Sequence, residues 1–538
     1  MAIPLLLSAL LVPTAHAALF EFDVLVYGAT PCGVLAADAA AFENATSRVA
    51  LLDPRALVGG CMAGGLANTD TGDDKRVIGG RAGKFFQQVA LHYGGAPGSA
   101  QYTFEPKVAE AIFRDFFLAS KPNLRLFSGA RIVGVGKEGA RIANVTTAAG
   151  DVFAARAFID ASYEGWLLPL AGVDFTWGRE PASQYNESAG GVADVVGHPG
   201  VYTVQPPLFE GADPFWANGT LLPLLTPNPG PLGSGDNRTQ AYMYRVTTTA
   251  VPGAFLQPWP RPAGYDPARY ELFARVLRAK GPGARLLGAC ANLPRGKCDS
   301  NSQYFDQPGP GFSWDYPAAV ARGDWAAQEA VWAAYRDLQL GLAYFLQNDP
   351  GVPAAQREAM GAFGLPLDEY ATAPVPGFPP QLYVREALRM VGDFVLTQAD
   401  REVALTKPDS VGMGSYTIDV IPVSRFARRN ATTGAWGAAL EGGIQAPSFL
   451  TPGLAPFELP YRALLPRRAQ ATNLLVPGAL SASHLGFCAV RLEPTWMVLG
   501  ESAGVAAAEA LRGGVAVQDV DVAALQARLR ALGQVLSL

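Results

Sequence analysis

The stretch VLVYGATPCGVLAAD, residues 24–38, decides the fold of this chain. Its first residues form the continuous apolar run of a buried parallel strand, and its alanine-rich end has the pattern of a helix. Between them, Gly28 and Gly33 match the first and third glycines of the G-x-G-x-x-G turn, which holds a dinucleotide phosphate at a helix N-terminus. Thr30 replaces the second glycine. Because ordinary strand–helix turns also use glycine, this motif needs a second signal.

The second signal is an acidic residue at the end of the next strand. RVALLD, residues 48–53, is an apolar strand that ends on Asp53, which follows Gly28 by roughly 25 residues. A carboxylate at this place accepts hydrogen bonds from an adenosine ribose, whereas the structural alternative is a strand-end turn with Pro54. The order of strand, turn, helix, strand and acid predicts a right-handed βαβ unit that binds a dinucleotide.

The rest of the chain extends this unit. Short strands separated by glycine-containing turns predict a β-meander inserted after it, in residues 124–136, 140–148 and 152–162. Residues 181–264 are rich in Pro, Gly and Asn and predict irregular structure. Asn473 begins another buried strand, NLLVPG. Helices are predicted over 108–117, 266–280, 325–347, 353–363, 382–396 and 493–511, the last with Pro494 at its first position.

Two segments favour FAD over NAD as the dinucleotide. GGCMAGGLANTDTG, residues 59–72, has glycines that allow close backbone approach to a flat ligand. The helix over 493–511 has a positive N-terminal end, which could face N1 and C2=O of a flavin and stabilise the negative charge of the reduced ring. Its small-residue face packs closely on neighbouring elements and consists of Gly500, Ala503, Gly504 and Ala507.

With these motifs the chain resembles the FAD-dependent oxidoreductases that have the glutathione-reductase-type nucleotide fold, and within them a group of secreted or periplasmic members whose substrates are mostly unassigned. The matching motifs extend over residues 22–512 and include VYGATPCG, GGCMAGGLANTD, FIDASYEG, SASH and RLEPTWMVLGESAG. The resemblance implies an α/β fold, with a Rossmann-like FAD-binding domain that carries the β-meander and a mixed α+β substrate domain. The expected order is a signal peptide at 1–17, the FAD-binding domain at 18–178 and 465–515, a substrate or cap domain at 179–464, and a C-terminal helix at 516–538.

The resemblance also assigns residues to the parts of FAD. Asp53, where the family more often has Glu, would meet the ribose. The family often places a His soon after SYTID; here VIPV follows, so that acid–base role has no carrier in this chain. The other implied contacts are Gly28, Thr30, Pro31 and Gly33 at the pyrophosphate, Ile132 and Val133 at adenine, the turn Asp160, Ala161 and Ser162, and, around the isoalloxazine, Gly60, Cys61, Gly65, Ser483, Glu493 and Pro494.

Two side chains are the candidate catalytic residues. His484 could accept a substrate proton near flavin N5, and a structural His with satisfied hydrogen bonds is the alternative. Arg491 could hold a substrate carboxylate or the flavin O2, or form an ion pair with Glu493. Glu493 is expected as the N-cap of its helix, and Cys61 as a small buried residue in preference to a redox thiol or a flavin tether. No Cys/His spacing indicates a zinc site.

Three further groups have both a functional and a structural interpretation. The loop with Lys297, Asp299 and Asn301 either lines a substrate cleft or is solvated. Arg385 and Arg389 share a face of the predicted helix at i, i+4 spacing, which favours a charged ladder over a clamp for an anion. Four tryptophans are expected mostly in the core, although each could stack on a substrate: Trp314, Trp325, Trp332 and Trp436.

The N-terminus and the cysteines predict the compartment. MAIPLLLSALLVPTAHA, residues 1–17, resembles a secretory signal with cleavage after Ala17. Of five cysteines, Cys290 and Cys298 bracket a loop that a disulfide could close. The net charge is -5 and Lys and Arg are not clustered, which argues against nucleic-acid and membrane partners. N-glycans are expected at six sequons: Asn44, Asn144, Asn186, Asn218, Asn237 and Asn430.

These observations predict a secreted FAD-dependent oxidoreductase, an oxidase or a dehydrogenase. It would transfer a hydride from a small organic substrate to flavin N5. The alternatives are an NAD-dependent dehydrogenase, a secreted glycoprotein that keeps the fold as a binding module with an inactive flavin site, and a lyase or isomerase that uses flavin without net turnover.

Overall fold

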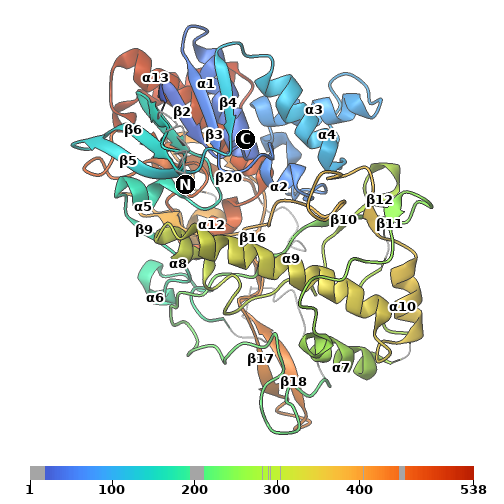
Figure 1. Cartoon of the computed structure of the whole chain (residues 1–538). Helices are drawn as coiled ribbons and strands as arrows, with labels where there is room; N and C mark the ends of the chain where they lie inside the picture. The colour runs from blue at the N-terminus through green and yellow to red at the C-terminus, as the bar shows by residue number, and fades with distance from the viewer. Residues whose placement is uncertain are drawn as a thin grey trace, which may run out of the picture.

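The computed structural model describes residues 18–193, 211–281, 283–288, 290, 292–302, 304–403, 405–446 and 455–538. The signal peptide predicted at 1–17 lies outside the described residues. Figure 1 shows a parallel sheet flanked by helices in the upper part of the molecule, with the segment 179–464 making up most of the lower part.

The βαβ unit predicted from residues 24–53 is confirmed. β2 (Val24–Tyr27), α1 (Pro31–Glu43) and β3 (Val49–Asp53) follow one another as expected. All neighbours in the sheet are parallel, and the order is β21-β8-β2-β3-β4. The remaining strands of this sheet are β4 (Leu124–Ser128), β8 (Ala157–Asp160) and β21 (Leu474–Leu475). Tyr27 pairs with both Leu52 and Asp160, so the polar strand ends meet at one edge of the sheet.

The predicted close packing of the C-terminal helix is confirmed. α13 (Glu493–Gly513) lies against α1 along its length, as Figure 1 shows. A Cβ on Gly500 would lie 2.1 Å from the Cys32 carbonyl oxygen, and one on Gly504 would lie 2.2 Å from the Ala36 carbonyl oxygen. Only residues without a side chain allow two helix backbones to approach this closely.

The β-meander is confirmed in part, as a second sheet with the order β1-β7-β6-β5, whereas residues 124–128 and 157–160 of the predicted meander belong to the parallel sheet. The last three strands of the second sheet are antiparallel neighbours, and β1 adds in parallel to β7. A cluster of phenylalanines, Phe20, Phe22, Phe127 and Phe153, packs between this sheet and β4. The bounds are β1 (Leu19–Glu21), β5 (Ile132–Glu138), β6 (Arg141–Thr147) and β7 (Val152–Ala154).

Several helices flank these sheets. The helix predicted over 108–117 is present, and it continues from α-helical into π-helical geometry. The helices are α2 (Gly60–Ala63), η1 (Lys75–Val77), α3 (Gly80–His92), α4 (Pro106–Ala111), η2 (Ile112–Leu118), α5 (Leu167–Ala171), α12 (His484–Val490), η6 (Val517–Asp519) and α14 (Val522–Ala531).

The segment 179–464 combines helices with two-stranded sheets. The predicted helices over 266–280, 325–347 and 353–363 are confirmed, and α9 crosses the molecule beneath the parallel sheet in Figure 1. Its helices are α6 (Ala182–Tyr185), η3 (Pro267–Tyr270), α7 (Glu271–Lys280), η4 (Pro294–Gly296), α8 (Tyr316–Ala321), α9 (Trp325–Asn348), α10 (Ala354–Gly361), α11 (Gln398–Glu402) and η5 (Tyr461–Leu464). Its strand pairs are β10 (Val246–Thr249) with β12 (Lys297–Ser300), β11 (Phe255–Leu256) with β13 (Leu365–Pro366), β15 (Ser410–Gly414) with β20 (Phe457–Pro460), β16 (Ile418–Val420) with β19 (Ile444–Ala446), and β17 (Ser424–Arg429) with β18 (Trp436–Glu441).

The helix predicted over 382–396 is wrong. This stretch is extended, and its strand β14 (Arg389–Met390) pairs with β9 (Phe175–Thr176). Arg385 forms an ion pair with Asp306 at 2.8 Å, and Arg389 is buried among acidic side chains. The charged ladder expected on a helix face is therefore absent here, because buried ion pairs with distant segments determine the backbone where local propensity favours a helix.

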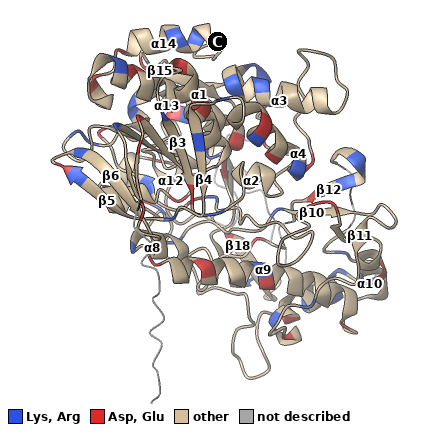
Figure 2. Cartoon of the chain, turned by 45° about the horizontal axis from the view of Figure 1, so that its top comes forward, with Lys and Arg blue, Asp and Glu red and all other residues tan. Residues whose placement is uncertain are grey.

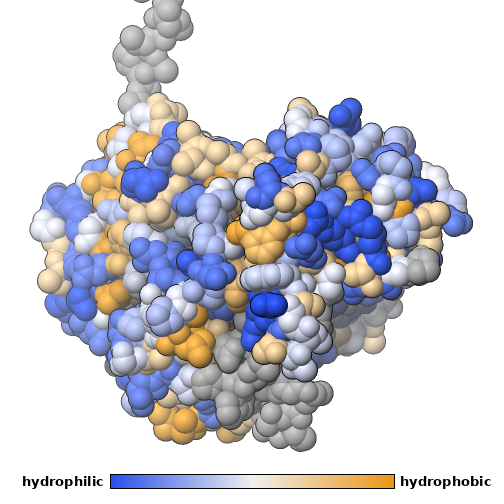
Figure 3. Space-filling view, turned by 90° about the horizontal axis from the view of Figure 1, so that it is seen from below, coloured by the Kyte–Doolittle hydropathy of each residue, from blue (hydrophilic) through white to orange (hydrophobic). Residues whose placement is uncertain are grey.

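The described surface is mixed in charge and hydropathy. Figure 2 shows acidic and basic residues dispersed over the helices, and Figure 3 shows apolar residues interspersed with polar ones on the face seen from below. Within the described ranges, no helix has the length and apolar character that a membrane span requires.

Candidate cofactor and substrate site

The turn between β2 and α1 has the geometry of a phosphate-binding turn. Gly28 has a φ of 102°, and a Cβ on Gly33 would lie 1.8 Å from the Gly28 carbonyl oxygen. Thr30 is the N-cap of the 13-residue helix α1: its Oγ1 accepts from the Gly33 N–H at 3.1 Å and donates to the Ala161 carbonyl at 2.8 Å. The second glycine of the motif is thus replaced by a capping residue that connects the turn to β8.

Asp53 lies at the end of β3 as predicted, but its near partners are backbone groups. Its carboxylate accepts from the Ala29 N–H at 2.6 Å and from the Arg55 N–H at 2.7 Å. Burial raises the pKa of Asp53 to about 6. Asp53 therefore holds the βα turn in place, and each of its oxygens keeps a second lone pair for a ribose hydroxyl.

Two hollows adjoin this turn. The smaller, of about 20 Å³, is lined by Gly28–Thr30, Asp53 and Arg55. The larger, of about 260 Å³, is lined by Tyr27, Ile132, Val133 and, from α9, Trp325. Trp166 lines both, so it separates the two spaces. The Ile132 N–H donates to the Tyr27 hydroxyl at 3.1 Å, which leaves the exposed Val133 as the freer of the two predicted adenine contacts.

Arg55 is a groove residue that the sequence analysis missed. Its guanidinium carbon lies 3.4 Å from the ring centroid of Trp332, and its Nη2 forms an ion pair with Glu329 at 2.8 Å. Trp332 and Glu329 both belong to α9. Helix α9 therefore closes the nucleotide groove from the side opposite the parallel sheet. The position of Arg55, two residues after the acid, is the only local signal that could have found it.

The turn after β8 is held together by Asp160. Its carboxylate accepts from the Ser162 hydroxyl at 2.6 Å, from the Ser162 N–H at 3.1 Å and from the Leu167 N–H at 2.8 Å. Burial raises the pKa of Asp160 to about 6. The Ala161 carbonyl accepts from the Thr30 hydroxyl, so the turn after β8 helps to position the turn between β2 and α1.

The glycines of residues 59–65 lie against protein atoms. A Cβ on Gly60 would lie 2.3 Å from the Tyr163 hydroxyl, and one on Gly65 would lie 1.8 Å from the Arg245 carbonyl oxygen. The same Tyr163 hydroxyl accepts from the Cys61 N–H at 2.9 Å and donates to Glu493 at 2.6 Å. Burial, followed by the charge of Glu493, raises the pKa of the Cys61 thiol, which agrees with the expected role as a small buried residue.

Glu493 does not cap α13. The N-cap is Leu492, Glu493 is the first helical residue, and Pro494 is therefore the second residue rather than the first. Burial raises the pKa of Glu493 to about 8. Tyr163, in the turn after β8, donates to this carboxyl and orients it. The contact joins distant segments, so a local capping pattern could not predict it.

His484 lies in a buried network of charged side chains. Its Nδ1 is 2.9 Å from a carboxylate oxygen of Glu386, which also pairs with Arg389. Its Nε2 is buried and has no hydrogen-bond partner among the described residues. Ser483 caps α12 by accepting from the Gly486 N–H, and it donates to Glu187 at 2.5 Å. The contact of Nδ1 with Glu386 thus orients the His484 ring, and Nε2 is available for a hydrogen bond to a ligand.

Arg491 pairs with Asp419, not with Glu493. Its Nη2 lies 2.8 Å from the Asp419 carboxylate, and its Nη1 donates to the Tyr383 hydroxyl at 3.0 Å. The alternative of an Arg491–Glu493 ion pair is therefore wrong. Asp419 belongs to the SYTID motif, so this ion pair fixes β16 onto the end of α12.

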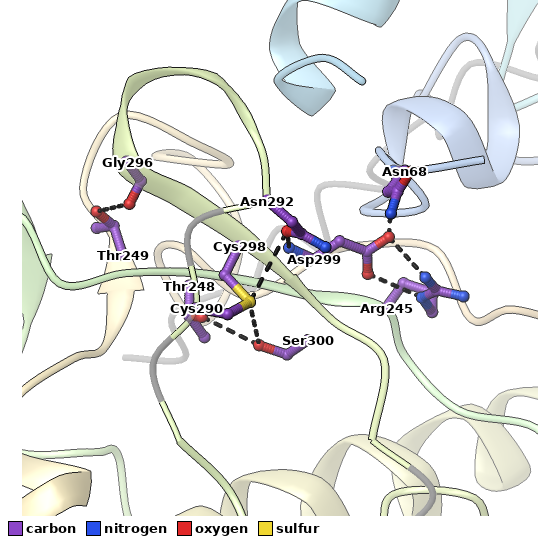
Figure 4. The surroundings of a disulfide bond; sticks show 10 residues. All are labelled: Asn68, Arg245, Thr248, Thr249, Cys290, Asn292, Gly296, Cys298, Asp299 and Ser300. Carbon is purple, nitrogen blue, oxygen red and sulfur yellow. Dashed lines mark hydrogen bonds and ion pairs between the residues drawn. A yellow bond between two sulfur atoms is a disulfide. The ribbon is translucent and has the colours of Figure 1, made fainter. Parts of the chain in front are cut away.

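A cavity of about 570 Å³ lies between the glycine-rich loop and β10, β12 and β16. Asp299 and Asn301 of the polar loop line it, whereas Lys297 is buried among Glu105, Asp368 and Glu369. Asp299 forms an ion pair with Arg245 at 2.6 Å and accepts from the Asn68 N–H, as Figure 4 shows. The predicted Cys290–Cys298 disulfide is present beside this cavity, with a Cα–Cα distance of 5.2 Å.

Among the described residues, two groups of side chains have a spacing that could hold a metal ion. Each already holds a cation. Arg389 pairs with Glu386 in the first group, which also contains His484 and Cys488. Lys297 lies among the three acids of the second, Glu105, Asp368 and Glu369. In both groups a protein cation therefore compensates the carboxylates.

The sequence matches the family model for FAD dependent oxidoreductases over residues 23–529. The chain belongs to this family. As a FAD-dependent oxidoreductase it is an enzyme whose cofactor is FAD. Among curated proteins none matches the chain.

Three solved structures are similar to part of this chain. GidA from Aquifex aeolicus is 18% identical over 27% of this chain and 25% of that chain, with a TM-score of 0.19. Thioredoxin reductase from T. acidophilum is 19% identical over 26% and 34%, with a TM-score of 0.17. The myxobacterial halogenase CndH is 18% identical over 30% and 41%, with a TM-score of 0.22. The chain spans less than half the length of each of these proteins.

The residues at the βα turn fit the pyrophosphate of FAD. Within the described chain, the N–H groups of Thr30 and Cys32 at the start of α1 have no hydrogen-bond acceptor. Free amides and a helix dipole at this position favour an anion. Arg55 adds a cation to the same groove, and the larger hollow offers aromatic walls from Tyr27, Trp166 and Trp325 for a flat base. The oxidoreductase therefore has a donor set and a shape that suit the adenosine diphosphate part of FAD.

Proposed function

We propose that this FAD-dependent oxidoreductase transfers a hydride from a small organic substrate to flavin N5, and that it acts in the secretory pathway or outside the cell. One observation carries the proposal. The cavity of about 570 Å³ and a small hollow at the start of α13 share two lining residues, Asp70 and Tyr416. A substrate-sized space thus adjoins the helix end that the sequence predicts to face the flavin.

FAD, when bound, supplies the hydride acceptor. The residues of the protein would bind the cofactor and shape the substrate cavity. Free amides of the βα turn and Arg55 would bind the diphosphate. The ordered pairs Arg491–Asp419 and Arg245–Asp299 hold the cavity walls. Because the Arg491 guanidinium is occupied by Asp419 and Tyr383, we assign it to positioning Asp419 and not to holding a substrate carboxylate.

We also propose that His484 accepts a proton during the reaction. Glu386 holds Nδ1, which fixes the ring and favours a proton on that nitrogen. The buried Nε2 can then accept a proton. Among the described residues His484 does not line the cavity of about 570 Å³, so a ligand confined to that cavity would not contact it.

The experiment for this function is an absorbance spectrum of the purified protein before and after acid precipitation. Bands near ~375 and ~450 nm show oxidised flavin, and bleaching under anaerobic conditions by a reducing substrate shows hydride or electron transfer. Colour in the supernatant indicates noncovalent FAD. A protein that stays colourless after incubation with FAD would contradict the proposal and favour the binding-module alternative.

Secretion is supported by the sequence of residues 1–17 and by the sequons. Four of the acceptor residues are exposed, Asn44, Asn186, Asn218 and Asn237. The test is expression of the full chain in eukaryotic cells. We expect protein in the medium, without residues 1–17, and a mass that falls on endoglycosidase treatment. Retention in the cytosol with the N-terminus intact would contradict it.

A further inference from the structure

The wall of the 570 Å³ cavity contains several acidic side chains. Four carboxylates line it: Asp70, Asp299, Asp306 and Asp419. Three of them have a dedicated arginine. Asp299 pairs with Arg245 at 2.6 Å, Asp306 with Arg385 at 2.8 Å, and Asp419 with Arg491 at 2.8 Å.

Asp70 is the exception. Within the described ranges, no Lys, Arg or His nitrogen lies within ion-pair distance of its carboxylate. It accepts a hydrogen bond from the Tyr416 hydroxyl, and burial, followed by the neighbouring charge of Asp419, raises its pKa. The Asp70 carboxylate therefore lacks an ion pair of its own, with the charges of Arg245 and Arg491 acting on it from farther away, and it lies at the end of the cavity next to α13. A desolvated carboxylate of this kind attracts a cation and repels an anion.

The rest of the wall is mixed, with a polar side formed by residues 300–302 and an apolar side. Trp259, Leu287, Phe305, Phe363 and Ile421 line the cavity together with the disulfide. A volume of about 570 Å³ is within the range of pockets that take small organic ligands. The cavity thus offers one carboxylate without an ion pair at the α13 end and an apolar side for the body of a ligand.

We propose that this cavity binds an organic amine, with its ammonium group on Asp70 and its apolar body along Trp259 and Leu287, and that this amine is the substrate. The proposal rests on the proposed function, since it names the substrate class of the same site. Among the described residues no Lys, Arg or His lines the cavity, and the three arginines behind its wall are paired with aspartates, so a substrate carboxylate would find no cation there. Amines without a carboxylate are therefore preferred over amino acids.

The chemistry places Asp70 as a catalytic residue. The ammonium of the substrate gives one proton to the Asp70 carboxylate, which leaves the nitrogen with a free electron pair. Bound FAD would supply the two-electron acceptor: the electron pair of the α C–H bond would leave the substrate as hydride, and the nitrogen pair would form the C=N bond. The substrate would thus lose one hydride to the acceptor and one proton to Asp70, and the product would be an iminium ion.

The test compares three probes of similar size on the holoenzyme at pH 7.5: benzylammonium, benzyl alcohol and benzoate. Binding is measured by calorimetry under anaerobic conditions, so that it does not depend on turnover. We expect the amine to bind at least about tenfold more tightly than the alcohol, which is 1.4 kcal/mol, and benzoate to bind more weakly than either. Equal binding of the amine and the alcohol would overturn the proposal, and this comparison needs no variant.

Two variants test whether Asp70 causes the preference for the amine. Asp70→Asn is expected to lose the tenfold preference for the amine while it binds the alcohol as the wild type does. Asp115→Asn, the same change on an exposed residue of η2, should leave all three affinities unchanged. Unchanged amine affinity in Asp70→Asn would contradict the role of Asp70. Loss of FAD from that variant would also overturn the proposal, because the cavity would then belong to the cofactor.

The outcomes separate this proposal from the proposed function. Amine binding that depends on Asp70 without any bleaching of the flavin would support the amine site and count against hydride transfer. Bleaching by an alcohol and not by an amine would support hydride transfer and overturn the amine proposal.

Discussion

At the scale of single residues, the site is organised by buried polar side chains that reach between distant segments. The Tyr163 hydroxyl joins the glycine-rich loop to α13, since it accepts from the Cys61 N–H and donates to Glu493. Asp53 and Asp160 each hold a turn by accepting backbone N–H groups. Such groups are costly to bury unless they are paired, so each contact fixes one geometry.

Glu493 gives a prediction for pH. Its pKa is raised to about 8 by burial, from 4.5 in the unfolded chain. As pH rises from about 4.5 to 8, the unfolded chain releases a proton that the native state keeps, so the free energy of unfolding falls. Glu493→Gln retains an acceptor for Tyr163 and cannot ionise. We expect its advantage over the wild type to grow to about 2 kcal/mol or more between pH 5 and pH 9.

Urea denaturation of both proteins at pH 5, 7 and 9 measures this difference. The control is Glu358→Gln, an exposed residue of α10. Its difference from the wild type should not vary with pH. A constant difference for Glu493→Gln as well would show that Glu493 is ionised in the native state.

Arg55 gives a prediction for cofactor affinity. Arg55→Gln removes the cation that lines the groove together with Gly28 and Thr30. Since a charged hydrogen bond to a diphosphate contributes about 1.5–3 kcal/mol, we expect the Kd for FAD to rise about tenfold or more. Reconstitution of the apoprotein, followed by flavin fluorescence, measures it. Arg48→Gln, on an exposed surface pair with Glu21, is the matched control and should bind FAD normally.

At the scale of elements, close backbone contact between α1 and α13 positions the cofactor turn. The contact is possible because Gly500 and Gly504 face the carbonyl groups of Cys32 and Ala36. These carbonyls belong to the first turns of α1, directly after the capping residue Thr30. The packing of α13 therefore determines where the free amides at the start of α1 lie.

Gly500→Ala tests this arrangement. The new Cβ would lie 2.1 Å from the Cys32 carbonyl oxygen, so one of the two helices has to move. We expect a loss of about 3 kcal/mol in the free energy of unfolding, together with weaker FAD binding. Gly361→Ala is the control, because a Cβ there meets no atom within 4 Å at the end of α10. That variant should be neutral or slightly stabilised, and an equal loss in both would contradict the packing argument.

At the scale of the whole molecule, the nucleotide groove is shared by segments far apart in the sequence. The βα turn supplies Gly28 and Thr30, the turn after β8 supplies Ser162, and α9 supplies Trp332. FAD bound there would connect the parallel sheet with the segment 179–464. Ligand binding to the native state alone stabilises it, by about 2.7 kcal/mol at a hundredfold excess over Kd.

Removal of FAD is therefore expected to lower the Tm by several degrees. Trp332→Ala should reduce this FAD-dependent shift, because it removes the ring that packs on Arg55 from α9. Trp436→Ala, on the exposed side of the hairpin β17–β18, should leave the shift unchanged. Differential scanning fluorimetry with and without FAD measures all three, and equal shifts in both variants would exclude α9 from the groove.

The sequence by itself determined the βαβ unit, the meander and the long C-terminal helix. Each of these has a periodic apolar pattern and turn residues with local conformational requirements, such as the positive φ of Gly28. It also determined the family, because the motifs occur in order along nearly the whole chain.

Only the tertiary structure decided the partners of the buried charges. Residues 382–396 look helical from their local pattern, yet Arg385 and Arg389 reach Asp306 and Glu180 across the fold and keep the backbone extended. Arg491 met Asp419 in place of the nearby Glu493 for the same reason. The pairing of a buried ion depends on which segments surround it after packing, and spacing along the chain carries no information about that.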